Sequence, residues 1–88
     1  MSASKETKEE VPYEKPCMVI RKNLVVCVDL WNRLEIVLIN LEKRTIKPIN
    51  SLFELVHELL RYDIEFDELS KVISYVSNRV KLLKKARS

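Results

Sequence analysis

Apolar residues form two short runs near the middle of the chain. Residues 24–31 and 34–41 are rich in Val, Ile and Leu, and only two polar residues separate them. β-Branched side chains are stiff and fit a pleated sheet better than a helix. The pattern therefore predicts two strands, and flanking runs at residues 17–22 and 45–49 extend them. We expect a small antiparallel β-meander of three to four strands over about residues 17–49.

A helix competes with this interpretation in the middle of the chain. Asp29 is a suitable N-cap, and a stripe of apolar residues follows it at helical spacing. The stripe consists of Leu30, Leu34, Val37, Leu38 and Leu41. Ile36 and Ile39 lie outside this stripe, so strands are favoured over a helix. The alternative fold is a β-hairpin plus three helices.

Two amphipathic helices are predicted after the strands. Ser51 and Glu54 have the spacing of a capping box at the start of a helix over residues 51–62. Apolar residues recur every three or four positions over residues 67–85. The connection is short, which predicts an antiparallel two-helix hairpin. The fold class is therefore α+β.

The pairing of the two central strands predicts a surplus of apolar surface. If residues 32 and 33 form a two-residue turn, Trp31 faces Leu34 and Val28 faces Val37. Both faces of the sheet are then largely apolar, whereas a half-solvated sheet alternates. We expect a partner to cover one face through Trp31, Leu34 and Ile36, because a tryptophan in an apolar patch is a typical anchor.

The length and composition predict one domain, residues 17–88, preceded by a flexible charged tail, residues 1–16. No apolar run approaches the ~20 residues of a membrane span, and no signal peptide opens the chain. We therefore expect a cytoplasmic protein.

The chain contains no glycine, so left-handed turn positions are expected at Asn23, Asn32 and Asn40. With many charges, this composition suggests a thermophilic source.

Cys17 and Cys27 lie in strand-like surroundings and are expected to be buried free thiols. A disulfide is the alternative if the source is hyperthermophilic. Two cysteines without CxxC spacing and one histidine do not make a zinc site. No metal or cofactor is predicted.

Charge is segregated along the chain, whose net charge is +3. Residues 50–68 are mainly acidic, whereas residues 69–88 carry basic residues and no acidic one. These basic residues are Lys71, Arg79, Lys81, Lys84, Lys85 and Arg87. They are candidates for contact with nucleic-acid phosphates, DNA or RNA. Cations at a helix C-terminus and ordinary solvated lysines are the competing explanation. Basic residues at the predicted strand ends could extend the surface: Arg21, Lys22, Arg33, Lys43, Arg44 and Lys47.

Enzyme motifs are missing from the sequence. Without glycine there is no P-loop and no dinucleotide-binding fingerprint. The single histidine, His57, is expected to be structural or exposed. Asp29 is the best isolated acid or base, on a mostly apolar sheet face, but it has no evident partner. We therefore expect a non-enzymatic protein with no small-molecule substrate.

Two functional hypotheses follow. The first is a small accessory subunit of nucleic-acid machinery, such as a polymerase or another replication or processing complex. It would dock through an apolar sheet face and contact phosphates through the basic C-terminal helix. The alternative is a protein-only interaction module or a homodimeric assembly factor.

Overall fold

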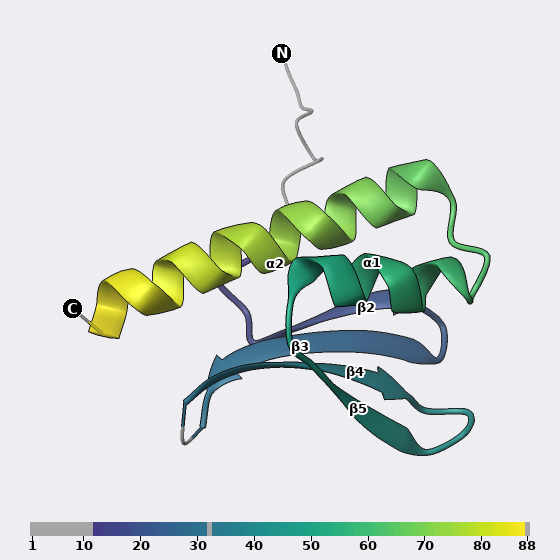
Figure 1. Cartoon of the computed structure of the whole chain (residues 1–88), viewed down its shortest axis with the longest axis horizontal. Coiled ribbons are helices and arrows are strands. Elements are labelled where there is room, and N and C mark those ends of the chain that lie inside the picture. The colour runs from purple at the N-terminus through teal and green to yellow at the C-terminus, as the bar shows by residue number, and fades with distance from the viewer. Residues whose placement is uncertain (1–11, 32, 88) are drawn as a thin grey trace, which may run out of the picture.

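The computed structural model describes residues 12–31 and 33–87, without the Arg87 side chain, and has two layers (Figure 1). Its strand order is β2-β3-β4-β5, and each neighbouring pair is antiparallel. The elements are β2 (Cys17–Arg21), β3 (Leu24–Leu30), β4 (Leu34–Asn40), β5 (Thr45–Ile49), α1 (Leu52–Leu60) and α2 (Phe66–Arg87). The predicted α+β meander followed by two helices is confirmed. The alternative with a helix starting near Asp29 is wrong, because that residue lies in β3.

Both helices cover the same face of the sheet (Figure 1). Alternate residues of the central strands point toward them, and Val26 and Val28 are fully buried. The helices contribute Leu55, Leu59 and Tyr75, which are also fully buried. Burying each such side chain stabilises the fold by roughly 1.5–3 kcal/mol. The core therefore lies between the helical layer and one face of the sheet.

The first helix starts as its capping pattern predicts. The Ser51 hydroxyl accepts from the Glu54 N–H at 3.1 Å. The Glu54 carboxylate accepts from the Asn50 N–H at 2.9 Å, one residue before the position expected for a capping box.

The second helix, α2, has 22 residues and runs back antiparallel to α1 (Figure 1). It starts one residue before the predicted range and ends two residues after it. In the described part of the chain, no helix is both long and apolar enough to cross a membrane.

The predicted register between β3 and β4 is wrong by one residue. Leu30 pairs with Leu34 and Val28 with Ile36, so three residues connect the strands. The Trp31 N–H closes this turn by donating to the Arg33 carbonyl at 3.1 Å. Because side chains alternate between the faces of a sheet, the one-residue shift moves Leu34 and Ile36 to the face that carries the helices.

Left-handed backbone occurs where the sequence did not predict it. Arg44 has φ of 57° and Asp63 has φ of 58°, and no other described residue has positive φ. Asn23 and Asn40 do not take this role, and Asn32 lies outside the described residues. Asn40 supports its turn through the side chain instead, because its amide oxygen accepts from the Lys43 N–H at 3.0 Å.

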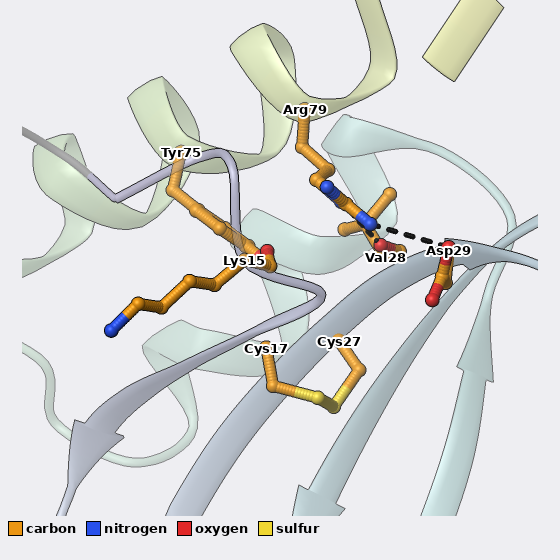
Figure 2. Close-up of a disulfide and its surroundings, with 7 residues drawn as sticks. All are labelled: Lys15, Cys17, Cys27, Val28, Asp29, Tyr75 and Arg79. Atoms are coloured by element: carbon orange, nitrogen blue, oxygen red, sulfur yellow. Dashed lines mark hydrogen bonds and ion pairs between the residues drawn. A yellow bond between two sulfur atoms is a disulfide. The ribbon is translucent and has the colours of Figure 1, made fainter. Parts of the chain in front are cut away.

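The two cysteines form a disulfide, so the expectation of free thiols is wrong. Cys17 and Cys27 are direct partners across β2 and β3. The bridge points away from α2 (Figure 2). The pairing of β2 with β3 brings the two residues together, which the separation of ten positions in the sequence does not reveal.

Candidate nucleic-acid and partner interface

The exposed lysines of the predicted basic cluster lie on the C-terminal part of α2. Lys81, Lys84 and Lys85 are all exposed. At 1.5 Å per residue, α2 is ~33 Å long and α1 only ~14 Å. The C-terminal part of α2 therefore extends past α1 (Figure 1). The three lysines occupy about one turn of this extension.

Arg79 belongs to the core and not to this exposed cluster. Its residue exposure is only 6%. The guanidinium donates to the Val28 carbonyl at 2.7 Å, to the Glu14 carbonyl at 3.1 Å and to the Asp29 carboxylate at 3.2 Å. Figure 2 shows it reaching from α2 to β3. We therefore remove Arg79 from the proposed phosphate contacts, because its charge is used inside the protein.

Of the remaining two predicted phosphate contacts, Lys71 is separate from the three lysines. Lys71 is exposed, but ten residues of helix place it ~15 Å before Lys81. It lines a depression beside β2 with Val19 and Glu68. The Arg87 side chain lies outside the described part of the chain.

A groove of about 470 Å³ brings part of both predicted sites together. Leu34 and Ile36, predicted to bind a partner, line it with Lys81 and Lys84. The other lining residues are Ile49, Asn50, Leu52, Ser77 and Val80. The groove lies where α1 does not accompany α2, so the half-buried β4 residues stay accessible. The lining of this groove thus combines five apolar side chains with four polar ones, two of which are lysines.

Trp31 lies in the turn between β3 and β4 and is 55% exposed. This turn is at the same end of the molecule as the C-terminus of α2 (Figure 1). Arg33 is in the same turn, with 81% side-chain exposure, and its Nε lies 3.9 Å from the Glu35 carboxylate. The end of the molecule that carries the lysines thus also carries an exposed aromatic side chain and an exposed arginine.

Two of the basic residues expected to extend this surface are bound elsewhere. Arg21 makes a bidentate contact to Glu68, at 3.0 and 3.4 Å. Lys47 donates to Glu58 at 2.6 Å. These hydrogen bonds lower the pKa of the Glu58 and Glu68 carboxyls, because they favour the charged form. The acidic segment, residues 50–68, is therefore partly neutralised by basic residues of the sheet.

The other turn lysines lie at the opposite end of the sheet. Lys22 follows β2, and Lys43 and Arg44 lie between β4 and β5. The Leu41 N–H donates to the Asn23 carbonyl at 2.8 Å, which places these two turns side by side. They are therefore remote from the basic end of α2.

Asp29, the best acid or base candidate from the sequence, has a structural partner. Its carboxylate accepts from Arg79 and, at 2.8 Å, from the Leu30 N–H. Fifty positions separate Asp29 from Arg79, so sequence spacing does not reveal the pair. His57 is exposed on α1. Within residues 12–31 and 33–87, no group of three or more His, Cys, Asp or Glu side chains could hold a metal ion.

A second apolar surface, the open face of the sheet, was not predicted as such. It is formed by the side chains that point away from the helices. We define it by Val19, Val25, Val37, Ile39, Ile46 and Pro48, which alternate with the helix-facing residues of the four strands. Val19 is 67% and Ile46 68% exposed. This face could be recognised only with the correct register between β3 and β4, because the register decides which residues lie on the open face and which lie on the face with the groove.

Comparisons with known proteins add no family to these observations. No protein-family model matches the chain, and neither the curated proteins nor the solved structures give a significant match.

Proposed function

We propose that this protein is a small non-enzymatic accessory subunit of nucleic-acid machinery, such as a polymerase or another replication or processing complex. Its basic end contacts phosphates, and an apolar face of the sheet docks on protein. Phosphate contacts of this kind are independent of sequence and sensitive to salt.

One observation carries the phosphate contact. Lys81, Lys84 and Lys85 are exposed on the part of α2 that extends past α1, and no acidic residue follows Glu68 in the sequence. The three lysines therefore form a cluster of positive charge on about one turn of the helix. This arrangement supports a local positive surface, although the net charge of the whole chain is only +3.

The groove supports a protein contact at the same end. Leu34 and Ile36 line it, and Trp31 is exposed in the adjoining turn. In this proposal apolar side chains of a partner enter the groove, while the lysines beside them contact the nucleic acid. The partner and the nucleic acid then meet at one end of the molecule.

The test is binding of fluorescent single-stranded and duplex DNA and RNA at ~50 mM salt and upward, measured by anisotropy. The triple variant Lys81→Gln, Lys84→Gln, Lys85→Gln removes up to three phosphate contacts. We expect the slope of log K against log salt for duplex DNA to become shallower by up to ~2.7, at ~0.9 per contact.

A matched control neutralises three exposed cations elsewhere, with Lys15→Gln, Lys22→Gln and Arg61→Gln. We expect the control to retain the wild-type slope. Absence of binding at ~50 mM salt, or an equal loss in both triple variants, contradicts the proposed phosphate contact.

A protein-only interaction module is the second candidate, and the open face of the sheet favours it. A tagged pull-down from the native host, with and without nuclease, separates the two. Partners that disappear on nuclease treatment support the accessory subunit, whereas partners that persist without any bound nucleic acid favour the protein-only module.

We also propose that the protein works in the cytoplasm of a thermophile. Disulfides are rare in the reducing cytosol of mesophiles, but intracellular proteins of hyperthermophiles contain them. The Cys17–Cys27 bridge and the glycine-free sequence are compatible with such a source. Mass spectrometry of the protein from its native host, alkylated before any reduction, tests whether the bridge exists in the cell.

A further inference from the structure

Trp31 is exposed in the turn between β3 and β4, beside the groove but outside it. Its residue exposure is 55%, and it is not among the residues that line the groove. Leu30 and Leu34 are the last cross-strand partners before the turn. The Cα of Trp31 therefore lies ~6 Å from that of Leu34, one strand spacing across and one residue along. Because Leu34 lines the groove, a partner can occupy the groove while the indole binds a second group next to it.

The exposed lysines of α2 lie at the same end of the molecule as this turn (Figure 1). Lys81 and Lys84 line the groove from α2, and Leu34 lines it from β4. Lys85 follows on the exposed surface of the helix. A ligand that crosses the mouth of the groove therefore meets both the lysines and the indole of Trp31.

Two acidic residues near the turn have arginine partners. The Asp29 carboxylate accepts from Arg79 at 3.2 Å, and the Glu35 carboxylate lies 3.9 Å from the Arg33 Nε. Each of these pairs is neutral, so the positive charge at this end comes from the lysines of α2. A surface with this charge favours an anionic ligand.

A cluster of cations beside an exposed indole matches a ligand that is both polyanionic and aromatic. Nucleic acid has both properties, because lysines contact its phosphates and aromatic side chains stack on its bases. In a duplex the bases are stacked on one another, so an indole at the surface gains no base to stack on. In a single strand the bases are accessible, and stacking on an aromatic side chain strengthens binding whatever the base. The indole therefore favours the single strand over the duplex.

We propose that the basic end of this protein binds single-stranded nucleic acid, with one base stacked on Trp31 and neighbouring phosphates on Lys81, Lys84 and Lys85. The inference rests on the proposed phosphate contact and adds the form of nucleic acid that is recognised. Stacking on one indole selects for accessible bases and not for a particular sequence. DNA and RNA share this chemistry, since the indole contacts the base and the lysines contact the phosphates.

The test follows the fluorescence of Trp31, which is the only tryptophan in the sequence. The full chain is titrated at ~50 mM salt with oligothymidylate, oligouridylate, a duplex and an abasic deoxyribose-phosphate strand, all of equal length. Saturable quenching by oligothymidylate, oligouridylate or both supports the proposal and identifies the sugar that is accepted. The abasic strand has the same phosphates but no bases, and we expect it to bind ~10-fold more weakly, in line with the loss of one stacked base.

The variant Trp31→Ala removes the indole and leaves the lysines in place. Measured by anisotropy of a labelled oligonucleotide, its affinity for the single strand should fall ~10-fold, while its affinity for the duplex should not change. Phe53, 83% exposed on α1, gives a matched control, and Phe53→Ala should change neither affinity. Circular dichroism spectra and urea midpoints identify a variant that fails to fold, and the comparison with the abasic strand needs no variant.

Three results overturn the proposal. They are equal binding of the oligonucleotide and the abasic strand, a loss in Trp31→Ala no greater than in Phe53→Ala, and tighter binding of the duplex than of the single strand. Each of them leaves the phosphate contact of the lysines in place, and the first two leave Trp31 as an anchor for a protein. Absence of binding to every probe contradicts the proposed function itself, and this inference with it.

Discussion

Arg79 is the residue for which the sequence and the structure suggest different roles, and its replacement distinguishes them. The variant Arg79→Met keeps an unbranched apolar stem but removes the guanidinium and all its donors. The Val28 carbonyl, which accepts from Arg79 at 2.7 Å, then loses its partner inside the core. A buried group left unsatisfied costs ~1–3 kcal/mol.

The other acceptors of Arg79 contribute less. Asp29 has a side-chain exposure of 35% and Glu14 is exposed, so both recover water when the guanidinium is removed. Losses at such solvated pairs are ~0–1 kcal/mol each. The expected decrease in the free energy of unfolding is therefore ~3 kcal/mol. With an m-value of ~1.5 kcal/mol/M in urea, the midpoint falls by ~2 M.

The charge-conserving variant Arg79→Lys separates structure from phosphate contact. Lysine has a single ammonium group that cannot bridge three acceptors on different segments. We expect it to lose most of the same stability, while the control Lys81→Met, two residues further along α2, changes stability by less than ~0.5 kcal/mol. Wild-type stability in Arg79→Lys would refute the reasoning.

Two further predictions concern the disulfide and Tyr75. Closing a loop between Cys17 and Cys27 should stabilise the fold by ~2–3 kcal/mol. The variant Cys17→Ala, Cys27→Ala should therefore melt ~10–20 °C lower in calorimetry and, unlike the wild type, be insensitive to reductant. Burial raises the pKa of Tyr75 to about 12, above the ~10 of an unfolded chain. The unfolded state then loses its proton first, so stability is complete below pH ~10 and decreases by ~2–3 kcal/mol as pH rises toward 12. Urea midpoints across this window should fall less steeply in Tyr75→Phe, and equal slopes would contradict the assignment.

The elements of the fold could be predicted from the sequence because they depend on local patterns. The β-branched runs define the strands, and Ser51 with Glu54 defines the start of α1. The register could not be predicted in the same way. The sequence between the strands does not distinguish a two-residue turn from a three-residue turn. The length of the turn nevertheless decides which residues share a face.

Contacts between segments that lie far apart in the sequence could not be predicted either. Arg79 appears as one of six cations after Glu68, and only the packing of α2 on β3 shows that it bonds to Val28 and Asp29. The left-handed positions at Arg44 and Asp63 illustrate the same limit. Intrinsic preference favours asparagine there, but turn geometry decided which residues adopt that conformation.

The shifted register changes the location of the apolar surplus but not its existence. The predicted pairing mixed the two faces, and it placed Leu34 and Ile36 on a partner surface opposite Val26 and Val28. In the structure Leu34 and Ile36 share the helical face and line the groove. The apolar residues on the other face include Val37 and Ile39. The two helices leave one face of the sheet uncovered, and the C-terminal end of α2 extends past α1. Two separate apolar surfaces result. The groove with its lysines therefore lies at one end of the molecule, and the open face of the sheet is a separate apolar surface.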